Sequence, residues 1–411
     1  MRIKIKKYKG NTQIYMTALI LYIFADVFLY KSQIGYRVPT TVLLMMYWLV
    51  DALLIIKLLS SLVGYGRHEN LKIIGILALI VITGEITKDQ NYVCMLLLIC
   101  NGYDVDFDEI IKVMAISIIF SITVVLVLYN IGIIGESISY RINETRHSVG
   151  FKYMGSLDDL FRHSMIIILY LNLKKSEPSR AKNSFILVSI FAVGSYAIYK
   201  LSLSRTNMYI SEVFCILYLL FCVRKGGYKR EVRLWLKVKE VFAIICIPIC
   251  AIVSCVLPKY LYNSSILLGI NSMLTGRVAL ANNALKTYDY KLFGQNVTWI
   301  GSESVARGTY TMADYNYVDN GYIQVGLQYG IIVLVIICIA YSYLFYSMVK
   351  EHNTFMCIWI ALMGIENLIN PTLLRFTSNA VTLFAVQFYV MKGRNYSRKR
   401  IYKFEMNNLE K

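Results

Sequence analysis

The sequence predicts an all-α, polytopic membrane protein, and three observations lead to that prediction. Of the 411 residues, 57% are hydrophobic and only 17% are charged, which leaves too little polar surface for a soluble protein of this size. Apolar runs long enough to cross a bilayer recur from one end of the chain to the other. Because backbone N–H and C=O groups find no partner in lipid, we expect these runs to be helices.

About twelve spans are expected, and they leave no room for a large soluble domain. Residues 1–411 therefore form a single integral membrane domain. The fourth run is the shortest, and one broken hairpin across 71–101 is the alternative to two separate spans there. The predicted spans are 13–30, 38–63, 71–87, 90–101, 109–134, 154–173, 183–202, 206–223, 239–258, 319–348, 354–371 and 375–391.

The distribution of Lys and Arg predicts the orientation in the membrane. With the N-terminus inside, the segments predicted to face the cytoplasm hold 27 of the 43 Lys and Arg residues, and those predicted outside hold 15. The positive-inside rule then places both termini in the cytoplasm and the long loop 259–318 outside, between spans nine and ten. We therefore interpret the net charge of +18 as cationic clusters that orient the protein and lie against anionic lipid headgroups. No nucleic-acid partner is expected.

The sequence contains no signature of metal or nucleotide chemistry. The nine cysteines lie in or beside predicted spans without a CxxC pair, and the four histidines are scattered. No HExxH, Walker loop, GxSxG or GxGxxG motif occurs. We therefore interpret the cysteines as small hydrophobic side chains and expect neither a metal nor a cofactor.

The loop 259–318 contains a candidate anion site at Arg277. A short helix is predicted to begin after Thr275, which places Arg277 in its first turn. A cation there opposes the helix dipole, so its position needs another reason. Backbone N–H groups and a guanidinium pointing the same way would form a phosphate or diphosphate clamp. The alternative is a surface Arg277 paired with Glu303 or Asp314.

Polar residues also cluster where the chain returns to the membrane after this loop. Asp319, Asn320 and Gln324 lie at helical spacing, and polar groups at that depth usually line a cavity or pair with one another. Arg205 and Arg375 are further candidates for an anion contact at the outer face, with interfacial snorkelling as the alternative. Other spans contain polar residues too, and a structural pair of Lys57 with Asp26 or Asp51 is expected. These residues are Asp26, Asp51, Lys57, Glu85, Glu212, Glu366 and Asn370.

Five segments recur in a recognisable order along the chain. They are Ile110–Ile134, Arg146-His-Ser-Val-Gly-Phe151, Leu201-Ser-Leu-Ser-Arg205-Thr206, Leu274-Thr-Gly-Arg277 with Ala284-Leu285 and Leu292-Phe-Gly294, and Val318-Asp-Asn-Gly-Tyr322 with Tyr329-Gly330-Ile331. Together they resemble the Wzy-type O-antigen and capsular polysaccharide polymerases, a group that also includes the O-antigen ligases.

Two departures from the family pattern are visible. The second segment continues with Lys152-Tyr-Met-Gly-Ser156 in place of Pro-Asn, so no role is transferred to 153–156. Ligases of the group tend to have a His where this chain has Asp319-Asn320, which favours a polymerase.

The resemblance implies a GT-C-like fold and a glycosyltransferase at the outer face of the bacterial cytoplasmic membrane. Its substrate would be an oligosaccharide repeat unit linked to undecaprenyl diphosphate, with membrane lipids, a flippase and a chain-length regulator as partners. A hydroxyl of one unit would attack the anomeric carbon of the growing chain, and the polyprenyl diphosphate would leave. No metal or nucleotide sugar is implied. The competing functions are a lipid-linked oligosaccharide flippase or transporter, and an O-antigen ligase.

In this interpretation two residues act in catalysis. Arg277 stabilises the charge that develops on the leaving diphosphate. Asp319 orients or deprotonates the acceptor hydroxyl. The residues expected to bind substrate are Arg146, Arg205, Asn320 and Arg375.

Overall fold

The chain is mostly helical in its computed structural model, which describes residues 9–62, 67–102, 105–141, 144–175, 179–223 and 233–384. Within these residues, six helices are long and apolar enough to cross a membrane. This confirms the coarse prediction of an all-α membrane protein. The six are Gly10–Tyr30, Thr40–Ser60, Phe107–Asn130, Arg180–Ser202, Leu236–Tyr260 and Ile331–Lys350.

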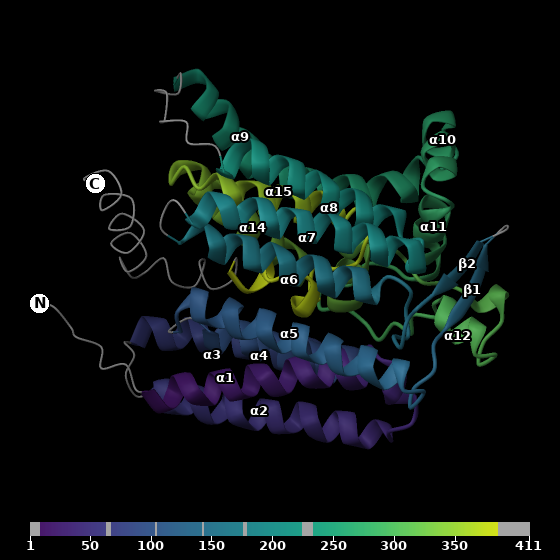
Figure 1. Cartoon of the computed structure of the whole chain (residues 1–411), viewed down its shortest axis with the longest axis horizontal. Coiled ribbons are helices and arrows are strands. Elements are labelled where there is room, and N and C mark those ends of the chain that lie inside the picture. Colours follow the sequence, from purple (N-terminus) through teal and green to yellow (C-terminus); the bar gives the residue numbers. More distant parts are fainter. Residues whose placement is uncertain are drawn as a thin grey trace, which may run out of the picture.

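The long helices lie side by side in two groups (Figure 1). Helices α1 to α5 form one group, α6 to α9 with α14 and α15 form the other, and α5 packs on α6 between them. The bounds in the first group are α1 Lys9–Phe24, α2 Thr40–Leu62, α3 Arg67–Thr87, α4 Gln90–Asn101 and α5 Phe107–Asn130. Those in the second are α6 Ser156–Leu173, α7 Ser179–Ser202, α8 Arg205–Tyr218, α9 Arg233–Tyr260, α14 Ile331–Lys350 and α15 Thr354–Glu366.

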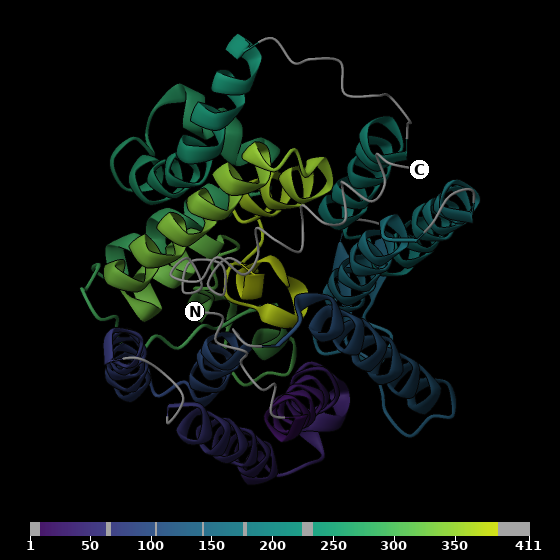
Figure 2. The same ribbon diagram turned by 90° about the vertical axis from the view of Figure 1, so that its left-hand side faces the viewer.

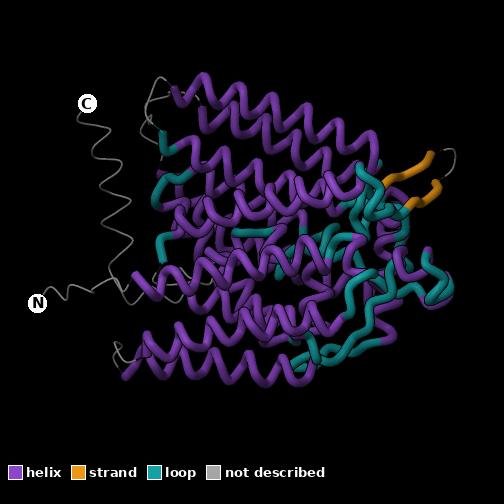
Figure 3. Tube along the Cα trace, turned by 60° about the horizontal axis from the view of Figure 1, so that its bottom comes forward, coloured by secondary structure: helices purple, strands orange, loops and turns teal. Residues whose placement is uncertain are grey.

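The predicted outward segments gather at one end of the helices (Figure 3). The first contains a hairpin of β1 Ile138–Arg141 and β2 Glu144–His147, in which Ile138 faces His147. The loop 259–318 contains three short helices, α10 Ser265–Met273, α11 Arg277–Thr287 and α12 Ser302–Ala306. The hairpin and the long loop, the longest connections between the described helices, therefore lie at the same end.

The predicted span 319–348 is interrupted. It begins as α13 Gly321–Gln324, continues as one π-helical turn over Val325–Tyr329, and stops at Gly330 before α14 begins. Gly330 has φ +98° and ψ 162°, a conformation that is essentially restricted to glycine. The middle of the long loop packs there, since Ile331 N donates to Lys291 O at 3.1 Å and Gln295 N donates to Gln328 O at 2.9 Å.

The predicted span 375–391 is not a continuous helix over its described part. The stretch from Leu373 to Leu383, buried except for Arg375, is mostly irregular and lies among the helices, as the yellow segment at the centre of Figure 2 shows. Irregular backbone is tolerated at such a depth only where protein groups satisfy it. Here Ala380 N donates to His163 Nε2 at 2.6 Å, and Thr382 Oγ1 donates to Leu373 O at 2.7 Å. Residues 385–391 of this prediction lie outside the described residues.

Two smaller predictions concern polar residues and connections in the first group. The segment 71–101 forms two helices, α3 and α4, separated at Lys88 and Asp89. The expected pair of Lys57 with Asp26 or Asp51 is wrong. Lys57 Nζ donates to the carbonyl of Asn101 at 2.5 Å, Asp26 pairs with Lys31 at 2.7 Å, and Asp51 accepts from Gln90.

Gly330→Ala is expected to destabilise the fold by about 1–3 kcal/mol or more, because the backbone conformation is unfavourable for a side chain. A methyl group there would also overlap the backbone of Leu292–Gly294. The measurement is thermal unfolding of the purified protein in detergent. Gly269→Ala in α10 is the matched control, since a Cβ there meets nothing within 4 Å. Equal melting temperatures for the two variants would contradict the assignment.

Candidate functional site

A small polar cavity lies at the end of the helices that contains the hairpin and the long loop. Its volume is about 20 Å³, space for about one water molecule. The groups around it therefore converge on one point, although they come from segments as far apart in the chain as Tyr153 and Asn370. The lining residues are Tyr153, Ser204, Thr206, Asn207, Arg277, Asp319, Ile369 and Asn370.

Arg277 and Asp319 form an ion pair in this cavity. Arg277 is the first residue of α11, after Gly276 in the left-handed conformation with φ +88°. Its Nε lies 3.3 Å from Asp319 Oδ2, and its Nη1 donates to the carbonyl of Ile369. The alternative partner Asp314 accepts from Thr311 instead. The Arg277 side chain is 25% exposed, so its remaining N–H donors can be reached from outside.

The carboxyl group of Asp319 lies in a mixed electrostatic environment. Burial raises the pKa of Asp319 above its ordinary value, and the nearby charge of Asp159 acts in the same direction. Arg277, Arg375 and Arg146 oppose this rise. Burial and the surrounding charges thus act on the pKa of Asp319 in opposite directions, and a carboxyl group beside fixed cations can serve as a general acid or base.

Arg375 and Arg146 do not line the cavity, but the charges of both act on Asp319, and we refer to them as the rim arginines. The exposed Arg375 donates from Nη2 to Tyr317 Oη at 2.6 Å. Arg146, on β2, donates from Nε to the carbonyl of Ser202 at 2.7 Å. Their charges both act on Asp319, so three of the predicted arginines surround this one carboxylate.

The structure places the other two predicted residues differently. Arg205 begins α8 but is exposed and lies 3.9 Å from Glu144 on β2, while its neighbours Ser204 and Thr206 line the cavity. Asn320 caps α13, because its side-chain oxygen accepts from Ile323 N at 3.0 Å. Its amide nitrogen donates to Ser254 Oγ at 3.0 Å and to Leu368 O at 2.9 Å. Asn320 is thus engaged within the fold.

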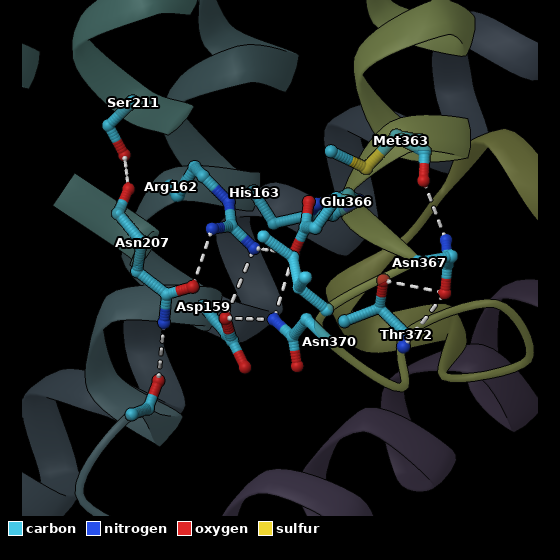
Figure 4. Close-up of polar contacts among 12 residues, drawn as sticks. Asp159, Arg162, His163, Asn207, Ser211, Met363, Glu366, Asn367, Asn370 and Thr372 are labelled. Atoms are coloured by element: carbon cyan, nitrogen blue, oxygen red, sulfur yellow. Dashed lines mark hydrogen bonds and ion pairs between the residues drawn. The ribbon is translucent and has the colours of Figure 1, made fainter. Parts of the chain in front are cut away.

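A buried network beneath the cavity was not predicted from the sequence (Figure 4). The fully buried Arg162 of α6 donates to Asn207 Oδ1 at 2.9 Å and pairs with Asp159 at 3.1 Å and with Glu366 of α15. Asn370 donates to Glu366 at 2.9 Å and to Asp159 at 3.2 Å. Because Asn207 and Asn370 also line the cavity, this network fixes its floor.

The sequence contained partial signals for these residues. Glu366 and Asn370 stand one helical turn apart in an apolar run, and polar groups in such a place usually have a partner. Nothing in the sequence links them to Arg162. Tyr153, which lines the cavity, follows the Arg146–Phe151 segment at the point where the resemblance ends.

The site is therefore defined by its own geometry: an Arg277–Asp319 pair, two rim arginines and a buried polar floor. Its charge balance suits an anionic group next to a proton-accepting carboxylate. Comparison with protein-family models, curated proteins and solved structures gives no match for the chain.

Proposed function

We propose that the chain is a polysaccharide polymerase that uses undecaprenyl-diphosphate-linked oligosaccharide repeat units at the outer face of the bacterial cytoplasmic membrane. The observation that carries the proposal is the convergence of separate segments at one cavity. Four of the five segments that resemble the polymerases supply a residue to the cavity or its rim: Arg146, Ser204, Arg277 and Asp319.

The proposal includes a membrane arrangement of twelve spans with a GT-C-like fold. The end of the molecule with the hairpin and helices α10 to α12 faces outward, and both termini face the cytoplasm. Support comes from the excess of Lys and Arg in the segments that the sequence predicts to face the cytoplasm. The lipid-linked substrate then meets the cavity from the outer leaflet.

In the proposed reaction, an acceptor hydroxyl oxygen forms a bond to the anomeric carbon of the growing chain. The bond between that carbon and the diphosphate oxygen breaks, and the electron pair stays on the leaving diphosphate. Asp319 accepts the hydroxyl proton. Arg277 stabilises the charge on the leaving group, and Arg146 and Arg375 add positive potential at the rim.

Arg277→Ala is expected to slow polymer formation by about 10²–10³-fold, the usual effect of removing one group that stabilises a developing charge. Surface polysaccharide on a gel should change from long chains to single repeat units at equal membrane levels of the protein. Arg205→Ala is the matched control, because this exposed arginine does not line the cavity.

Two outcomes would contradict this assignment. If the polysaccharide chains of Arg277→Ala are as long as those of the wild type, Arg277 has no role in the transfer. Accumulation of repeat units on the cytoplasmic face would show that the protein flips the lipid-linked unit instead.

The rate of polymer formation by the purified protein is expected to rise with pH along an acidic limb. Asp319 accepts a proton only when ionised, and burial raises its pKa above the ordinary value for Asp of about 3.9. The rise of the rate should therefore occur at a pH above that pKa. In Asp319→Asn, most of the activity and its rise with pH should both be lost. Asp289→Asn is the control, because Asp289 is an exposed carboxylate of the same loop. A limb that persists in Asp319→Asn would assign the proton to another group.

A further inference from the structure

A second, apolar pocket lies beside the candidate site, between the ends of α1 and α2. Its volume is about 160 Å³. An apolar cavity of about 150 Å³ holds a benzene molecule, so this pocket has space for about one five-carbon isoprene unit. Its lining residues are Leu29, Tyr30, Gly35, Val38, Pro39, Thr40, Leu43 and Lys152.

Backbone hydrogen bonds fix the position of Lys152 at this pocket. Lys152 N donates to the carbonyl of Lys31 at 2.8 Å, and Gln33 N donates to the carbonyl of Gly150 at 2.9 Å. The side chain of Gln33 also donates to Phe151 O at 3.0 Å. The segment around Lys152 is thus bound to the connection between α1 and α2, and the lysine is part of the pocket wall.

Two cations meet at one aromatic ring there. Lys152 Nζ lies 4.4 Å from the centre of the Tyr36 ring, and the guanidinium carbon of Arg307 lies 3.7 Å from it. Among the described residues, no carboxylate lies within ion-pair distance of either cation. Burial lowers the pKa of Lys152 to about 8, and the charge of Arg307 contributes to this shift. Neighbouring cations of this kind are complementary to an anion, which relieves their repulsion.

The pocket and the candidate site share a wall. Lys152 lines the apolar pocket, and the next residue, Tyr153, lines the cavity of Arg277 and Asp319. A ligand held at Lys152 is therefore bound by the residue that precedes the Tyr153 wall of the candidate site in the chain.

We propose that this pocket binds a second polyprenyl diphosphate lipid, with its diphosphate at Lys152 and Arg307 and its first isoprene unit between Leu29, Val38 and Leu43. The inference rests on the proposed function, in which two lipid-linked molecules must be bound together. The donor loses its diphosphate, which belongs beside Arg277. The acceptor keeps its diphosphate bond, so its site needs binding groups but no proton acceptor.

The test measures binding of sugar-free undecaprenyl diphosphate to the protein in phosphatidylcholine nanodiscs by native mass spectrometry. The wild type should bind two molecules and Arg277→Ala one. In the Arg277→Ala background, Lys152→Met should weaken the remaining binding by about tenfold or more, and Lys152→Arg should restore it. Lys200→Met in the same background is the matched control, because Lys200 lies over the Tyr196 ring at 5.2 Å but does not line the pocket.

Val38→Phe separates recognition of the lipid from recognition of phosphate, because it fills the pocket and leaves both cations in place. It should weaken binding of undecaprenyl diphosphate and leave binding of inorganic diphosphate unchanged. The inference is overturned if neither Lys152→Met nor Val38→Phe changes lipid binding, or if inorganic diphosphate binds as tightly as the lipid. Failure of the proposed function is a separate result: Arg277→Ala would then form normal polymer and bind two lipids, and Lys152→Met should still reduce that number to one.

Discussion

The ion network of Arg162 is the interaction on which the candidate site most depends. A guanidinium with no exposed surface must be paired, and removing one partner of a buried pair typically costs about 3–5 kcal/mol. Here the partners come from α6 itself and from the end of α15. Asn207 of α8 accepts from the same guanidinium, so one charge fixes three helices relative to one another. The cavity with Arg277 and Asp319 lies directly on this junction.

The irregular chain after α15 is a second consequence of the same requirement for partners. A segment without helical hydrogen bonds can lie inside the bundle only because side chains of other helices satisfy its backbone. His163 does so for Ala380, one position along the chain from Arg162. Arg162 and His163 are neighbours on α6. Arg162 holds the floor of the site, and His163 holds the irregular chain at Ala380. These two roles explain why a mostly apolar helix contains both residues.

The helical membrane class could be predicted from the sequence, because the lengths of apolar runs respond directly to the bilayer. A short helix with Arg277 in its first turn could also be predicted, since it depends on local residues, although its cap is Gly276 and not the expected Thr275. The interruption at Gly330 could not, because it depends on contact with Leu292–Gly294 of the loop. The Arg162–Glu366 pair joins positions 204 residues apart, and no local pattern indicates it. Asn320 was expected in the site for its polarity, yet a cap explains it.

Gly294 and Gly330 touch backbone to backbone, and this contact changes the nature of the long loop. It divides the chain between α9 and α14 into two closed loops, one containing α10 and α11 and the other containing α12 and Arg307. The entropic cost of closing a loop grows only with the logarithm of its length, so each half is closed at little extra cost once the middle is anchored. The first half includes Arg277, and the second includes the cation at Tyr36. Arg277 and Arg307 therefore belong to two separately closed halves of one loop, so a change of length in one half need not displace the cation of the other.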